Sequence, residues 1–104
     1  MARIAFRGRI LPGARDEYIR RHRAVDPGLL ADLKQAGARN YTIYLSGDDL
    51  FGYLEVDDLA AYETAMSASR ANQAWQAEMR TLVSFDLGAT DGQPTALREV
   101  FRLD

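Results

Sequence analysis

The chain contains no cysteine and has a single histidine, His22, among its 104 residues. Without cysteine it can form no disulfide framework, no thiolate nucleophile and no cysteine zinc site. One histidine also excludes a multi-histidine metal site within one subunit, although carboxylates alone can hold a hard cation. Any catalysis must therefore come from other groups.

An excess of charge of one sign and a long hydrophobic run are also missing. Thirteen Lys and Arg against 15 Asp and Glu give a formal net charge of -2, which offers no basic field for counterion release from nucleic acid. Arginines interrupt the first ten residues, and no apolar run approaches a membrane span. We expect a cytoplasmic protein that binds neither nucleic acid nor membrane.

The length of the chain predicts one domain over residues 1–104, because single domains usually hold one or two hundred residues. A monomer this small leaves a large fraction of its surface exposed. Because 47% of the residues are hydrophobic and 10% are aromatic, we expect some apolar surface to be covered by a second subunit. The predicted assembly is a homodimer.

The first third of the chain predicts one strand and two helices. Residues 3–11, "RIAFRGRIL", alternate between apolar side chains and arginines, which is typical of a half-buried strand. A proline and a glycine then break the pattern, and residues 14–25 are predicted to form an arginine-rich helix. Asp26 before Pro27 is typical of an N-cap followed by a first-turn proline, so a second helix should start there and end at Gly37.

The middle of the chain predicts a β-hairpin. The runs "NYTIYL" and "LFGYLEV" are separated by "SGDD", which is a turn composition. Tyr41, Ile43 and Leu45 share one face of the first run, and Thr42 and Tyr44 share the other. Large side chains on both faces are expected for a sheet that is covered on both sides.

The remainder predicts two helices and a closing strand. One helix is capped by Asp57 or Asp58 and runs to about Met66, and another covers residues 70–83. After a loop at "GATDGQPT", residues 96–103, "ALREVFRL", are predicted to be the last strand. The order matches an α+β fold of the ferredoxin-like split βαβ type, in which helices cover one face of a four-stranded antiparallel sheet.

Tyr18 and His22 lie one turn apart on a predicted helix, so a phenol and an imidazole could meet one ligand. Neutral imidazole both donates and accepts a proton near pH 7, which suits reversible proton transfer. From spacing alone, a solvated charged helix face with His22 as one more polar residue is favoured, because most lone histidines are not catalytic. Trp75 is similarly open between a core position, which its spacing favours, and a platform for the face of a sugar ring.

Four stretches, "EYIRRH", "LKQAGARNYTIYL", "NQAWQAEM" and "REVFRL", together resemble the L-rhamnose mutarotase family. The resemblance runs along almost the whole chain without large gaps. It implies a dimeric α+β barrel, an isomerase that interconverts the α and β anomers of a 6-deoxy sugar, and no cofactor or metal. The expected partners are a monosaccharide substrate and a second copy of the chain.

Carried over position by position, the family's catalytic histidine falls on His22, and its sugar-contacting tyrosines fall on Tyr18 and Tyr41. The resemblance thus implies a catalytic role for the histidine, which spacing alone does not favour. The family's paired tryptophans match Trp75 and Gln76. The first ring is therefore kept as a stacking surface, and a carboxamide replaces the second.

Two positions depart from the family pattern, because Gln76 replaces a ring and Asp26 stands where the family usually has a tryptophan before the proline. Hydrogen-bonding groups in place of apolar plates alter the preference among hydroxyl configurations. The expected substrate is L-rhamnose or a close relative such as L-fucose. His22 would serve as acid and base in opening and closing the sugar ring, which can supply about 10²–10⁴-fold acceleration without a metal.

Two other functions compete with this one. The same barrel architecture hosts cofactor-independent monooxygenases and enzymes acting on aromatic or haem-like substrates. Those sites need a large apolar pocket, whereas the candidate side chains here are hydroxylated and amphipathic; oxygen uptake would distinguish the two. The third hypothesis is a non-catalytic sugar-binding or regulatory domain, which would bind sugar without accelerating anomer exchange.

Overall fold

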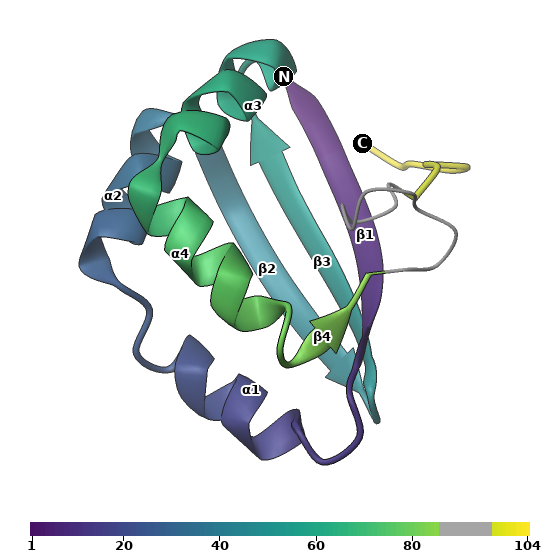
Figure 1. Ribbon diagram of the computed structural model, residues 1–104. Coiled ribbons are helices and arrows are strands. Elements are labelled where there is room, and N and C mark those ends of the chain that lie inside the picture. The colour runs from purple at the N-terminus through teal and green to yellow at the C-terminus, as the bar shows by residue number, and fades with distance from the viewer. Residues whose placement is uncertain (86–96) are drawn as a thin grey trace.

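A computed structural model describes residues 1–85 and 97–104 of the chain (Figure 1). Within them, the elements in chain order are β1 (Ala2–Ile10), α1 (Arg15–His22), α2 (Pro27–Gln35), β2 (Ala38–Ser46), β3 (Asp49–Val56), α3 (Leu59–Ala68), α4 (Arg70–Met79) and β4 (Val83–Ser84). The strands pair antiparallel in the order β2-β3-β1-β4. The predicted ferredoxin-like fold is confirmed, with two helices in each crossover.

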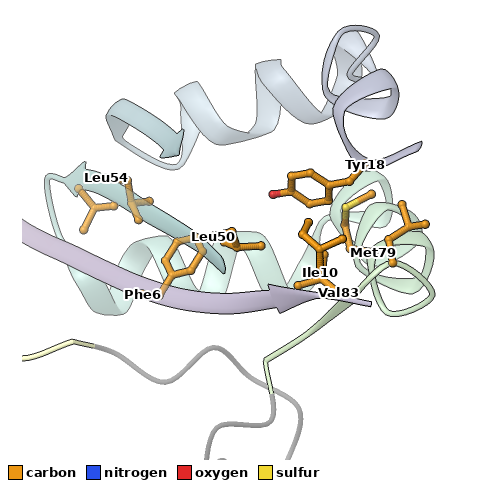
Figure 2. Close-up of a cluster of buried hydrophobic side chains, with 9 residues drawn as sticks. Phe6, Ile10, Tyr18, Leu50, Leu54, Met79 and Val83 are labelled. Carbon is orange, nitrogen blue, oxygen red and sulfur yellow. The ribbon is translucent and has the colours of Figure 1, made fainter. Parts of the chain in front are cut away.

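The two faces of the sheet differ in the way that the sequence alternation predicts. On β1, Phe6 and Ile10 are buried on the face that the helices cover, while Arg7 and Arg9 are exposed on the other. Figure 1 shows the helices gathered on one side of the sheet. The apolar core therefore lies between this face and the helices, and Figure 2 shows its buried side chains.

A close approach between β1 and β3 positions one aromatic ring of the core. Phe6 pairs with Gly52, and a Cβ at Gly52 would collide with the Phe6 ring. The glycine thus leaves space for this ring, as expected where a side chain lies directly over a strand. Phe6 in turn packs edge-to-face on Tyr41 of β2, with ring centroids 6.3 Å apart.

Side-chain caps start the helices where the sequence predicts them. Asp26 accepts a hydrogen bond from the backbone N–H of Gly28 at 2.9 Å, and Pro27 is the first residue of α2. Asp58 caps α3 in the same way through the N–H of Ala61 at 3.0 Å. The first helix is shorter than predicted and ends at His22 rather than residue 25, because the chain must leave helical geometry before the Asp26–Pro27 pair.

Two predictions about the last third of the chain are wrong. The helix predicted over residues 70–83 ends at Met79, and Val83 instead pairs with Ile10 as part of β4. No strand forms in residues 97–104, where a closing strand was predicted; β4 takes the place beside β1. Apolar side chains at these positions fit either pattern, so their spacing could not distinguish a helix end from a strand. The predicted loop "GATDGQPT" lies outside the described residues.

The C-terminal segment, residues 97–104, is attached to β1 through few contacts. The N–H of Leu97 donates to the carbonyl oxygen of Ala5 at 2.7 Å, and Arg3 forms an ion pair with Glu99 at 3.1 Å. Val100, Phe101 and Leu103 are all exposed, Val100 by 87%. None of the described helices has the length and apolarity that crossing a bilayer requires. The cytoplasmic location remains a prediction.

Candidate functional site

Tyr18 and His22 meet on the last turns of α1, as the sequence predicts. Their ring centroids lie 4.2 Å apart, and Nδ1 of His22 lies 2.8 Å from the carbonyl oxygen of Tyr18. A carbonyl oxygen can only accept, so Nδ1 carries the proton and donates it. In the neutral ring this tautomer leaves a lone pair on Nε2. The helix itself therefore prepares Nε2 as a proton acceptor.

Trp75 of α4 lies beside this histidine. The His22 and Trp75 ring centroids are 5.0 Å apart, and the rings are nearly perpendicular at 79°. Nearby, Arg21 of α1 forms an ion pair with Glu78 of α4 at 3.0 Å, which ties the two helices together. Trp75 also packs against the hydrophobic core. Its core position and its place next to a reactive side chain are therefore compatible.

Tyr41 faces the helix-covered side of the sheet, next to an irregularity in β2. Ala38 pairs with Val56 and Ile43 with Gly52, so both face the helices although their positions differ by five, an odd number. A register shift between Arg39 and Thr42 supplies the extra residue. Asn40, at the shift, has a φ of 50°, a conformation that asparagine adopts more readily than most residues. Tyr41 lies two positions before Ile43, so strand alternation gives both the same inward direction, and the bulge brings Ala38 onto that face as well.

Three phenols share one region on the helix side of the sheet. Burial raises the pKa of Tyr18 to about 12, and Tyr18 is only 5% exposed. Burial, followed by the charges that Tyr62 and Tyr18 would carry, raises the pKa of Tyr41, although 41% of this side chain remains exposed. At neutral pH these phenols stay protonated and can donate hydrogen bonds.

Tyr62 is the member of this group that the sequence did not predict for the site. It lies on α3, is half-buried against the core, and has a pKa that burial raises. Its spacing with Leu59 and Met66 indicates only an apolar helix stripe. Nothing in the sequence marks its hydroxyl as different from that of another core tyrosine, so the fold was needed to place it near Tyr41.

Gln76 and Asp26, the two positions that depart from the family pattern, form no hydrogen bond or ion pair with His22 among the described residues. Gln76 is half-buried on α4, and its Nε2 donates to Oδ1 of Asn72 at 3.3 Å. Asp26 is exposed and caps α2. A hollow of about 310 Å³ lies between β1, Tyr53 of β3 and the C-terminal segment, and none of the predicted site residues lines it.

A sequence model of the L-rhamnose mutarotase family matches residues 3–103. The chain is 35% identical to an L-rhamnose mutarotase from Oceanobacillus iheyensis, with all of both chains covered. It is 37% identical to one from Pectobacterium atrosepticum over the full length of both. Against one from Ligilactobacillus salivarius the identity is 40%, with 89% of each chain covered.

Among solved structures, the fold is similar to the crystal structure of an L-rhamnose mutarotase from Formosa agariphila. The TM-score is 0.78, with 23% sequence identity and all of both chains covered. At this identity the likeness concerns the fold. The full-length matches to the sequence relatives carry the family assignment.

Proposed function

The chain belongs to the L-rhamnose mutarotase family, and we propose that it interconverts the α and β anomers of L-rhamnose with His22 as the proton donor and acceptor. One observation supports the proposed catalytic role of His22. Its Nδ1 is committed to the Tyr18 carbonyl oxygen, which leaves the lone pair on Nε2 of a ring that lies next to the rings of Tyr18 and Trp75. A base held in one tautomer next to an aromatic face is suited to a sugar hydroxyl.

Mutarotation exchanges protons without oxidation or group transfer. Nε2 of His22 removes the proton from the anomeric hydroxyl, the C1–O5 bond breaks, and the protonated imidazole delivers that proton to the ring oxygen. The C1–C2 bond then rotates, and the ring oxygen attacks the other face of the aldehyde. The same groups run the step in reverse, so one histidine that alternates between neutral and protonated forms is sufficient.

The tyrosines hold the sugar rather than act as bases. A phenol whose pKa is about 12, like that of Tyr18, keeps its proton at neutral pH and donates a hydrogen bond to an oxygen of the sugar. Tyr41 is expected to do the same from the sheet side. Trp75 offers its ring to the C–H face of the pyranose, and Gln76 adds a carboxamide next to it.

We further propose that the chain acts as one domain over residues 1–104 and as a homodimer. The sheet face opposite the helices exposes Tyr44 by 64% and Phe51 by 42%, and these residues are cross-strand partners. The apolar side chains of the C-terminal segment are exposed as well. A second copy would cover this surface, because self-complementary patches favour two-fold dimers.

Saturation-transfer NMR tests the function directly, since it measures exchange between anomers at equilibrium. We expect the protein to accelerate exchange of L-rhamnose, and L-fucose as a comparison tests the substrate class. Sugar binding that raises the melting temperature without faster exchange would instead indicate a binding domain. Oxygen uptake with an aromatic substrate, and no exchange, would favour the monooxygenase alternative.

A further inference from the structure

The carboxamide of Asn72 on α4 lies between two partners that determine its direction. Its Nδ2 donates to the backbone carbonyl oxygen of Met66 at 3.1 Å, and its Oδ1 accepts from Nε2 of Gln76 at 3.3 Å. Because a backbone carbonyl only accepts, the NH₂ group of Asn72 must face Met66. Its oxygen must then face Gln76, which in turn must present its own NH₂ group.

The backbone of Asn72 is anchored as well. Its N–H donates to Oγ of Ser69 at 3.0 Å, and Oγ donates to a carboxylate oxygen of Asp32 on α2 at 2.6 Å. An ionised carboxylate can only accept, so the Ser69 hydroxyl is the donor and the direction of this chain of hydrogen bonds is also determined. Ser69 is 8% exposed and is the buried polar residue of the described core. The first turn of α4 is therefore held against α2.

These contacts occupy the NH₂ group of Gln76 and both ends of the Asn72 carboxamide, but not Oε1 of Gln76. In the part of the chain that the structure describes, this oxygen has no hydrogen-bond partner, although the side chain is half-buried. Gln76 adjoins Trp75, whose ring contacts His22. A half-buried acceptor is stabilised by a donor, and the hydroxyl of a bound sugar is one.

We propose that Asn72 is a positioning residue that orients Gln76 so that its Oε1 accepts a hydrogen bond from one ring hydroxyl of the sugar. This assignment rests on the proposed function and deepens it, because it names the chemistry by which this chain selects a sugar configuration. An indole at position 76 would offer a face to C–H groups and a single donor. The carboxamide oxygen requires a hydroxyl that donates.

Two substitutions and their combination test the proposal by anomer exchange at a series of L-rhamnose concentrations. Gln76→Met keeps the length of the side chain and removes the acceptor, so KM should rise about three- to tenfold, with the effect mainly on KM rather than kcat. Asn72→Ala frees Gln76 to turn and should raise KM about threefold. In the Gln76→Met background, Asn72→Ala should add nothing, because the group it orients is gone.

The conservative variant Asn72→Asp keeps an acceptor for Nε2 of Gln76 but loses the donor to Met66. It should restore part of the affinity that Asn72→Ala loses. Gln73→Met is the matched control, because Gln73 is exposed on the same helix and donates to the carbonyl oxygen of Ser67. If the melting curve shows that Asn72→Ala does not fold, Gln76→Met and Asn72→Asp still test whether Asn72 orients Gln76 toward the sugar.

The epimers of L-rhamnose at C2, C3 and C4 identify the hydroxyl. The wild-type protein should discriminate against one epimer, and Gln76→Met should lose most of that discrimination. The proposal is overturned if Gln76→Met leaves both KM and the epimer preference unchanged, or if Asn72→Ala has the same effect with and without Gln76. If His22→Ala still abolishes exchange in that case, the proposed function stands without this inference; no exchange by the wild-type protein would overturn both.

Discussion

His22 donates its Nδ1–H to the carbonyl oxygen of Tyr18, one helical turn earlier, over 2.8 Å. Both residues lie in α1, so the donor and the acceptor are one turn apart on the same side of the helix. The hydrogen bond keeps Nε2 of the histidine unprotonated in the neutral ring. One local hydrogen bond links the end of the helix to the proton-transfer step.

Replacing His22 with alanine should reduce anomer exchange toward the uncatalysed rate, by about 10²-fold or more, because it removes the proton acceptor. Sugar binding should weaken less, since Tyr18, Tyr41 and Trp75 remain. Saturation-transfer NMR measures the first effect, and the melting temperature with and without sugar measures the second. Arg23→Ala, an exposed neighbour, is the control. A variant that retains most of its exchange would reassign the base to a tyrosine or to Asp26.

Tyr18 should make the protein lose stability in alkali. Its pKa is about 12 in the folded protein and about 10 in an unfolded chain, because burial disfavours the phenolate. The unfolded state therefore releases this proton first, so the contribution is complete below pH 10 and is lost as pH rises from 10 to 12. Its size is about 2 kcal/mol. Denaturant unfolding at a series of alkaline pH values should show a shallower decline for Tyr18→Phe; an equal decline would contradict the assignment.

The sheet face opposite the helices should hold the homodimer together. Sedimentation at micromolar concentration is expected to give twice the chain mass of 11.6 kDa. Tyr44→Glu places a charge in the proposed interface and should shift the protein toward monomer. Leu30→Glu changes an exposed apolar residue on α2, outside that face, and should not. A wild-type protein that sediments only as a monomer would refute the dimer.

Gln76→Trp should shift the preference toward L-rhamnose over L-fucose. The change restores the ring that the family carries at this position, adds an apolar face and removes the carboxamide oxygen. We expect the ratio of the two exchange efficiencies to change by up to about tenfold, which is the scale of one contact in a sugar pocket. An unchanged ratio would show that residue 76 does not determine selectivity.

Much of the fold follows from local sequence patterns. The alternation in β1 and the caps at Asp26 and Asp58 depend only on residues that are close in sequence. The elements that these patterns predict are therefore the ones that the structure contains. The resemblance to the family identified the histidine, and its i, i+4 spacing from Tyr18 was visible in the sequence. The closing strand could not be predicted, because several apolar segments compete for one sheet edge and only packing selects Val83–Ser84.

The sequence by itself thus determined the order of the elements up to α4, the helical pair Tyr18 and His22, and the chemical types available for catalysis. Tertiary structure decided which side chains meet that pair. Trp75 reaches His22 because α4 packs beside α1, and Tyr62 lies near Tyr41 because α3 covers the same face of the sheet. Caps and hydrogen bonds between residues a few positions apart follow from the spacing of those residues in the sequence. Contacts between distant segments depend on how the helices and the sheet bury their apolar faces together.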